Sequence, residues 1–413
     1  MKIKICRSRI VFNLKMVIVF LTAFFKTKNQ REAVIENFEQ HFARYIGSKY
    51  AVSVASGKIA LYLCLSALNA KGKDKIIVPA YTVAEVIDIV VSMGLEPVFV
   101  DIDLNDGNMD AEKIEEAIDE RTKFILMTHI YGNPCDIYKI LELAKKYDLE
   151  VIEDAAQACG AEYDNRKTGS FGKLGYFSFG ILKNINTLGG GMVVTNDEIL
   201  AQRIKDLMRD FKPVSKIELL FRLIFAAVIA VVTHPVIFTA VIWPVMRIIP
   251  YNVLKKLNNP FKTKQIGVVE LDKLKVCYLA EQAALGLLQL DGIDKLNLRR
   301  MEKAKLLDKE LAKTGAANIF QDKKCARSIY LNYAIRVKNR GDLKKFLLKN
   351  GIDASEGLIG SCAHMERFKE YWRHCPNSRV LEEENLYVPI YPALKDVDIL
   401  KIARLIRLND EQL

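Results

Sequence analysis

Residues 50–195 alternate between short apolar runs and longer segments with helical periodicity, and this alternation restricts the possible folds more than any other feature. Helix-like segments such as GKIALYLCLSALNA and DIYKILELAKKYD separate the runs. Strands that are apolar throughout and alternate with helices are typical of a largely parallel sheet covered on both faces. The pattern therefore predicts an α/β fold with strands at 51–55, 75–79, 97–101, 124–129, 150–154, 176–179 and 192–195.

The rest of the chain adds two further regions. After residue 265 the sequence becomes helical, and a strand–helix–strand pattern follows between about 329 and 394. We interpret residues 295–413 as a smaller C-terminal α/β domain and residues 29–294 as the large domain, preceded by a basic and apolar segment at 1–28. A chain of 413 residues is long enough to bury a core in each of two domains.

Charge and cysteine content limit the classes of partner. The formal net charge is +11, which suits phosphate-bearing ligands or an anionic membrane surface. The sequence has no recognisable nucleic-acid-binding module, so we expect no nucleic-acid partner. The eight cysteines include no CxxC pair and are typical of reduced cytosolic thiols. Because Cys362, His364, His374 and Cys375 match no usual zinc spacing, we expect no metal site.

Polar motifs follow several of the predicted strands. They are SGK (56–58), THIYGNP (128–134), EDAAQ (153–157) and the segment around Lys183. Ligands of parallel α/β sheets bind beyond the carboxyl ends of the strands. Ordinary capping and turn residues would explain each motif singly, but their shared location predicts one site.

Lys183 stands between an apolar run and the three glycines 189–191. A lysine in a partly dry site suits a Schiff-base enzyme, because desolvation lowers its pKa and leaves a neutral, nucleophilic fraction. Pyridoxal phosphate (PLP) reacts with such a lysine and needs a carboxylate beside its ring nitrogen. Asp154 at a strand end is our candidate, with Glu153 as the alternative.

A helix start suited to the cofactor's phosphate lies at SGK. Ser56, Gly57 and Lys58 open this predicted helix, whose first amides can donate to an anion. By themselves, a lysine near glycines and one SGK motif are also compatible with structural or solvent-facing roles.

Six motifs in order resemble the DegT/StrS family of PLP-dependent sugar aminotransferases, which are fold type I enzymes. The resemblance runs from about residue 29 to the C-terminus, apart from one apolar insert. It is carried by FEQHFARYIGSKYAVSVASGKIAL (38–61), IIVPAYTVAEVIDIVVSMGLEPVFVDID (76–103), RTKFILMTHIYGNPCDI (121–137), LEVIEDAAQACGAEY (149–163), FSFGILKNINTLGGGMVVT (177–195) and QAALGLLQLDGIDKLNLRR (282–300). It implies a large PLP-binding domain with a largely parallel sheet and a smaller C-terminal α/β domain.

The resemblance also implies roles for individual residues. Lys183 would form the Schiff base with PLP and then move the proton between the two carbons of the transamination. Asp154 would pair with the pyridine nitrogen, and Gln157 would lie by the ring hydroxyl. Ser178 and the amides of Gly57 and Lys58 would hold the phosphate, next to the Ser56 already predicted at this helix start.

Several positions depart from the family pattern. Lys58 replaces the usual Thr or Ser, and Gly189 replaces the glutamate of the family's GEGG element. The aromatic residue that stacks on PLP is expected at Val83, which leaves Tyr81 as a candidate substitute. Lys275 stands where the family has an asparagine that reaches the neighbouring subunit's phosphate. We therefore expect PLP binding with substrate contacts that differ from the usual ones.

The function implied is transfer of an amino group from glutamate (or glutamine) to a keto-sugar, nucleotide-linked or lipid-linked, for cell-envelope polysaccharides. Relatives that act as dehydratases have histidine in place of the Schiff-base lysine, so Lys183 favours transamination. A sugar dehydratase and a catalytically inactive scaffold or regulator of the same fold remain the alternatives. Family members are commonly homodimers with active sites at the subunit interface.

The apolar insert lies at 217–250 and contains 24 residues without a formal charge (223–246). Pro235 interrupts this run, and each half has about half the helical length needed to cross a bilayer. Basic residues flank both ends. We predict a helical hairpin that dips into one leaflet, with a dimer interface or a core hairpin as the alternative.

The N-terminal segment supports the same interpretation. Residues 1–28 are basic and apolar, with ten uncharged residues between Lys15 and Lys26 and no A-x-A cleavage site. We expect an interfacial membrane anchor and a protein that is peripheral or monotopic at the cytoplasmic face of the membrane.

Overall fold

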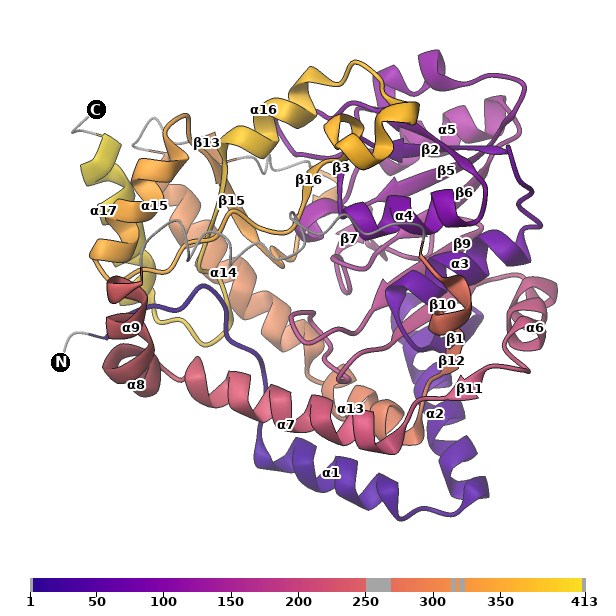
Figure 1. The fold of residues 1–413 in the computed structure, drawn as a ribbon, viewed down its shortest axis with the longest axis horizontal. Helices are drawn as coiled ribbons and strands as arrows, with labels where there is room; N and C mark the ends of the chain where they lie inside the picture. The colour runs from indigo at the N-terminus through magenta and orange to yellow at the C-terminus, as the bar shows by residue number, and fades with distance from the viewer. Residues whose placement is uncertain (1–2, 250–268, 313–316, 319–323, 411–413) are drawn as a thin grey trace.

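The computed structural model describes residues 3–249, 269–312, 317–318 and 324–410. At its centre is a seven-stranded sheet (Figure 1). The strand order is β1 (Tyr50–Val54), β10 (Gly191–Thr195), β9 (Leu174–Ser178), β6 (Glu150–Asp154), β5 (Thr122–Thr128), β2 (Lys75–Pro79) and β4 (Glu96–Val100). β10 is antiparallel to both its neighbours, and the other pairs are parallel. The predicted largely parallel sheet is confirmed, with each strand within two residues of its predicted run.

Helices cover both faces of the sheet because successive strand residues point to opposite sides. These helices are α2 (Lys28–Ile46), α3 (Gly57–Ala67), α4 (Ala84–Ser92), α5 (Ile137–Lys146), α6 (Glu198–Leu207) and α13 (Ala280–Leu290). On one face Val78 and Val193 share a core with α3, α4 and α6. On the other, Ile77 packs in a cluster with α5, and Met192 in a cluster with α2 and α13. Burial on both faces explains why the strands are apolar throughout.

The C-terminal part contains a smaller antiparallel sheet in the order β13 (Ala317–Asn318), β15 (Tyr333–Arg336) and β17 (Asn385–Val388). The helices around it are α14 (Ile293–Leu311), α15 (Arg340–Lys349), α16 (Pro376–Glu384) and α17 (Asp396–Asp410). One buried cluster joins this sheet to α14, α15 and α17, as expected for a small α/β unit. The predicted domain boundary at 294/295 falls at the start of α14 and stays a prediction.

Short elements complete the description. The paired ones are β3 (Tyr81–Thr82) with β16 (Gly360–Ser361), β7 (Glu162–Tyr163) with β8 (Arg166–Lys167) and β14 (Ala326–Arg327), and β11 (Lys212–Pro213) with β12 (Val276–Cys277). The short helices are η1 (Ala111–Lys113), η2 (Glu115–Ala117), η3 (Ile130–Gly132), α12 (Leu271–Leu274), η5 (Cys362–His364) and η6 (Glu366–Tyr371).

The apolar insert forms α7 (Lys216–Val232), α8 (Pro235–Ile237), η4 (Phe238–Ile242) and α9 (Trp243–Ile248). The helix breaks just before Pro235 as predicted, but the two parts are bent by 61°, so the predicted hairpin is not confirmed. The second part is held against the C-terminal unit and the N-terminal segment: Trp243 Nε1 donates to the Leu348 carbonyl at 3.1 Å, and the Lys4 amide donates to Thr239 at 2.9 Å. These contacts draw the second part away from the first.

The membrane-spanning potential of the described chain is limited to this insert. No single described helix has both the length and the apolar composition to cross a bilayer, whereas the bent pair meets both criteria together. Residue 250, the last of the predicted insert, lies outside the described residues.

The N-terminal segment runs from the C-terminal unit to the large sheet (Figure 1). Ile5 forms a β-bridge with Ile352, and Arg7 binds Asp353 through two hydrogen bonds. The chain then forms α1 (Leu14–Phe24), which packs against α13 and shares a buried cluster with α7. Residues 5–24 thus contact both halves of the molecule.

Candidate active site

Lys183 lies in the loop between β9 and β10, beyond the carboxyl end of β9. Its amide donates to the Gly180 carbonyl at 2.9 Å, which closes a turn and fixes the base of the side chain. Burial lowers the pKa of the Lys183 amine, and the nearby Asp154 carboxylate opposes part of this shift. A lysine held in this way has a larger neutral fraction at neutral pH than a solvated one.

Asp154 ends β6 and is 5% exposed. One carboxylate oxygen accepts from the Ala156 amide at 3.0 Å. Burial raises the Asp154 pKa, and the positive charge of Lys183 is among the groups that counteract the rise. The structure therefore brings the two predicted catalytic residues into one electrostatic environment.

Glu153, the alternative carboxylate, points to the other side of β6 and is fully buried. It accepts hydrogen bonds from three amides of the loop 169–172 and lies 2.9 Å from Nε2 of His129. The Cys135 amide donates to Nδ1 of His129 at 3.2 Å, so Nε2 carries the proton and donates to Glu153. Glu153 is thus occupied in fixing a loop, which leaves Asp154 as the carboxylate available to a ligand.

The predicted phosphate site lies where α3 begins beside β9. Ser56 caps α3, its hydroxyl accepting from the Ile59 amide at 3.3 Å. A Cβ added at Gly57 would lie 3.0 Å from Cβ of Ser178, so glycine lets the helix start pack closely against Ser178. Ser56 also forms a β-bridge with Gly190, so the glycine run packs directly on this turn. A helix start beside a serine fits a phosphate group.

Three further predicted residues have distinct surroundings. The Lys58 amine forms an ion pair with Glu85 at 3.2 Å. Gln157 accepts from the Tyr131 amide at 3.2 Å and lines a cavity beside Lys183. Tyr81 is fully buried and its hydroxyl accepts from Asn385 at 2.8 Å.

The ring-stacking position is not supplied by Tyr81 in this arrangement. Tyr81 is absent from the described residues that line the cavity, whereas Val83 is among them. Its side chain belongs to the buried cluster of the C-terminal unit, where Tyr131 donates to it at 2.8 Å. Contact of Tyr81 with PLP therefore stays a prediction that this geometry does not support.

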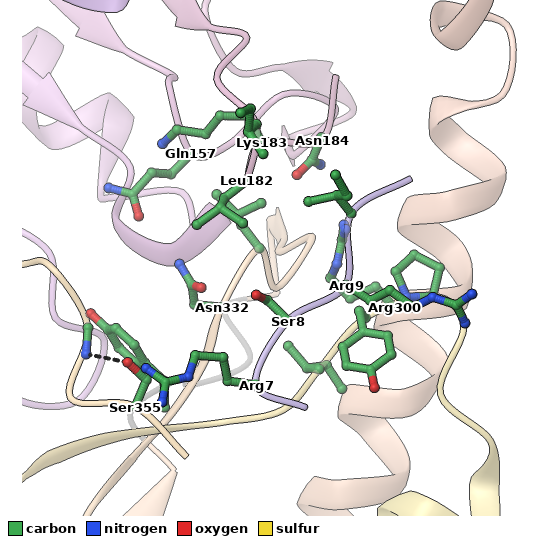
Figure 2. Close-up of a pocket in the computed structure, with 18 of the residues that line it drawn as sticks. Arg7, Ser8, Arg9, Gln157, Leu182, Lys183, Asn184, Arg300, Asn332 and Ser355 are labelled. Carbon is green, nitrogen blue, oxygen red and sulfur yellow. Dashed lines mark hydrogen bonds between the residues drawn. The ribbon is translucent and has the colours of Figure 1, made fainter. Parts of the chain in front are cut away.

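The cavity beside Lys183 has a volume of about 250 Å³ (Figure 2). The loop 181–184, helix α14, the C-terminal unit and the N-terminal residues 7–11 together form its walls. Sequence reasoning missed residues 7–11 and Arg300 as lining residues. The alternation of basic and apolar residues in KIKICRSRI is the available signal, but the pattern by itself indicates a membrane anchor.

Gly189 explains one departure from the family pattern. Its φ is +103°, and an added Cβ would lie 2.5 Å from Nη1 of Arg222 on α7. The same nitrogen donates to the Leu188 carbonyl at 3.2 Å. The space next to this glycine is thus filled by the first helix of the insert, which docks on the loop that carries Lys183.

Comparison with known proteins agrees with this geometry. The sequence profile described as the DegT/DnrJ/EryC1/StrS aminotransferase family matches residues 26–213 and 279–407. Residues 1–25 and 214–278, which include α1 and the insert, lie outside the matched ranges.

Two curated relatives and one solved structure illustrate the similarity. GDP-perosamine synthase of Escherichia coli O157:H7 is 43% identical over 169 residues, which are 41% of this chain and 46% of the relative. The dTDP-3-amino-3,6-dideoxy-alpha-D-galactopyranose transaminase of Aneurinibacillus thermoaerophilus is 43% identical over 189 residues, 46% and 52% of the two chains. These matches span about half the length of each relative. The aminotransferase from Psychrobacter cryohalolentis, 24% identical, superimposes with a TM-score of 0.78 over 98% of this chain and 100% of that one, which establishes a shared fold.

Proposed function

This chain belongs to the DegT/DnrJ/EryC1/StrS aminotransferase family, and we propose that it is a PLP-dependent aminotransferase. Its amine donor is glutamate or glutamine, and its acceptor is a keto-sugar carried on a nucleotide or a lipid. The observation that carries this proposal is the meeting of Lys183 with Asp154 at the carboxyl ends of β9 and β6. The sugar-transaminase relatives support the acceptor class.

The residues present fit PLP. The start of α3 at Gly57, beside Ser178, suits its phosphate, and the buried Asp154 suits its ring nitrogen. When bound, the cofactor supplies a conjugated ring that withdraws electrons from the substrate carbon. Asp154 keeps the ring nitrogen protonated, because a buried carboxylate beside a cation favours the charged pair. The neutral amine of Lys183 would remove the proton from the donor carbon, and the ammonium formed in that step would return a proton at the carbon that receives nitrogen.

A half-reaction tests this proposal. The purified protein, loaded with PLP, is mixed with glutamate, and released 2-oxoglutarate is quantified without any sugar. We expect one equivalent per site from the wild type and none from Lys183→Ala. Glutamine in place of glutamate identifies the donor, and release of neither keto acid would contradict transamination. Adding nucleotide-linked or lipid-linked keto-sugars afterwards identifies the acceptor by the return of bound PLP.

A location at the membrane surface completes the proposal. The helices α1 and α7 lie side by side (Figure 1), and Lys216 on α7 lies 4.5 Å from the ring of Phe24 on α1. Their outward faces expose large apolar residues: Leu14, Ile18, Leu21, Ile217, Leu220, Phe221, Ile224, Phe225, Val228 and Val231. A contiguous apolar face of this kind is unusual in a monomeric soluble protein. Lys15, Lys26 and Lys216, which lie in or next to these helices in the sequence, suit an anionic lipid surface.

Vesicle sedimentation tests the membrane proposal. Phe221 and Phe225 are 66% and 56% exposed, so replacing both with serine removes apolar surface without opening the core. We expect the wild type to sediment with vesicles that contain anionic lipid, and the double variant to stay in solution. Ile199, which is 71% exposed on α6, provides the control: Ile199→Ser should sediment like the wild type. Equal sedimentation of all three proteins would exclude this face as the contact.

A homodimer is the assembly we propose, since symmetric dimers are the commonest form of oligomeric enzyme. Light scattering coupled to gel filtration, in detergent and without it, measures the mass. A mass of one chain under both conditions would contradict the dimer.

A further inference from the structure

The charged side chains that line the cavity are all basic in the described part of the chain. Among the described residues that line it, four are basic (Arg7, Arg9, Lys183 and Arg300) and none is acidic. Arg7 is neutralised from outside the cavity by Asp353, which accepts from Nε at 2.7 Å and from Nη2 at 2.5 Å. With Lys183 assigned to the chemistry, two arginines remain without a protein counter-charge in the described part of the chain.

Arg300 is the more constrained of the two. It lies on α14 with 9% of its surface exposed, and Nη1 donates to the Asn297 side chain at 3.1 Å. Its Nε is buried without a hydrogen-bond partner among the described residues. Burial lowers the Arg300 pKa to about 10, so the guanidinium is still charged at neutral pH. A buried charge without a counter-charge is destabilising, and a bound anion removes that penalty.

The position of Arg300 is linked to the loop that carries Lys183. The Asn297 oxygen that accepts from Arg300 also accepts from Asn184 at 2.7 Å. The Asn297 amide group in turn donates to the Cys159 carbonyl at 3.1 Å. Arg300 is therefore held in place from the side of the protein, and in the described structure its guanidinium donates no hydrogen bond besides the one to Asn297.

Arg9 comes from the N-terminal segment, outside the part of the chain that matches the family. No ion pair or hydrogen bond involves its side chain in the described structure. The segment around it is fixed on both sides, by Arg7 bound to Asp353 and by Ile10 in the cluster with α1 and α7. Figure 2 shows Arg9 and Arg300 on the same side of the cavity, away from the Lys183 amine.

We propose that Arg9 and Arg300 form a subsite for the phosphate groups that link the sugar to its carrier. This inference rests on the aminotransferase function proposed above and adds to it a role for the N-terminal segment in binding substrate. Two uncompensated guanidinium groups match a diphosphate better than a single carboxylate, and arginine binds phosphate oxygens through paired donors.

Titration calorimetry on the full-length, PLP-loaded protein tests the subsite with inorganic pyrophosphate as the probe. We expect Arg9→Gln and Arg300→Gln each to weaken binding at least tenfold. Arg209→Gln, which changes an exposed arginine on the same protein, should bind like the wild type. If Arg300→Gln fails to fold, Arg9→Gln still decides the question, because Arg9 makes no side-chain contact that the fold needs. Unchanged pyrophosphate affinity in Arg9→Gln would overturn the proposal.

Further ligands identify the source of the phosphate. Tighter binding of uridine diphosphate than of pyrophosphate indicates a nucleotide carrier, and tighter binding of geranyl diphosphate indicates a lipid carrier. Glutarate is the carboxylate control: if the two variants weaken glutarate and leave pyrophosphate unchanged, the arginines bind the amine donor and the subsite is refuted. The glutamate half-reaction of the wild type is measured in parallel. Loss of that reaction with intact pyrophosphate binding would refute the aminotransferase alone.

Discussion

At the scale of single residues, the amine of Lys183 is subject to two opposing effects. Burial favours the neutral form and lowers the pKa, while the Asp154 carboxylate favours the charged form. The same pair of effects acts on Asp154 with the signs reversed, since burial raises its pKa and Lys183 lowers it. The balance keeps a reactive lysine next to a carboxylate that stays ionised when a cation is present.

Replacing Asp154 with asparagine should shift this balance in one direction. Without the carboxylate, only burial acts strongly on Lys183, so its pKa should fall further below that of an ordinary lysine. Competitive acetylation of the cofactor-free protein across a pH series, read by mass spectrometry at Lys183, measures the midpoint. The exposed Asp210→Asn should leave the midpoint unchanged. A midpoint in Asp154→Asn at or above the wild-type value would show that the two groups do not interact.

At the scale of elements, the central strands were predictable and the shape of the insert was not. The strands are buried on both faces, so local composition alone marks them. The composition also predicts helix α7, but its direction depends on the hydrogen bond from Arg222 to the Leu188 carbonyl. The direction of α9 depends in the same way on the hydrogen bond from Trp243 to the Leu348 carbonyl. Such contacts join residues far apart in sequence, and hydropathy and a proline cannot predict them.

The same limit applies to the candidate site. Lys183, Asp154 and Gln157 follow strand ends and could be found from motifs, whereas Arg9 and Arg300 meet only through the fold. Tyr81 is predicted from its ring and from its nearness to Val83 in sequence. Its burial in the C-terminal cluster could not be inferred, because the partner Asn385 lies 304 residues away.

The contact between α7 and the glycine run predicts the effect of a small side chain. Gly189→Ala places a Cβ at a positive φ, which costs about 1–2 kcal/mol, and pushes on the Arg222 guanidinium as well. We expect a loss of at least that much in the free energy of urea unfolding. The control is Gly341→Ala in α15, where nothing lies within 4 Å of an added Cβ and where alanine should stabilise by about 0.5–1 kcal/mol. Equal effects of the two substitutions would mean that Arg222 and the backbone at Gly189 impose no constraint.

At the scale of the whole molecule, two segments outside the family match connect the large sheet to the C-terminal unit. Residues 5–24 do so through Ile5, Arg7 and helix α1, and the insert does so through α7 at one end and Trp243 at the other. The two meet where the Lys4 ammonium lies 4.1 Å from the Trp243 ring. The cavity lies between the units that they join, so the same segments that carry the exposed apolar face also set the position of its walls.

Arg7 is the residue on which this connection depends most. Its side chain is 23% exposed and binds a carboxylate, on Asp353, that is 7% exposed, so Arg7→Ala leaves a buried charge unpaired. We expect a loss of about 3–5 kcal/mol in the free energy of unfolding. Hydrogen exchange should rise at 351–357 and at 5–11 together, because the β-bridge between Ile5 and Ile352 opens with the ion pair. Arg7→Lys keeps the charge without the paired donors, so its free energy of unfolding should fall between those of the wild type and Arg7→Ala. Arg209→Ala removes an exposed ion pair and should change neither the free energy of unfolding nor the hydrogen exchange. Faster exchange at 5–11 with no change at 351–357 would show that the N-terminal segment covers the cavity without joining the two units.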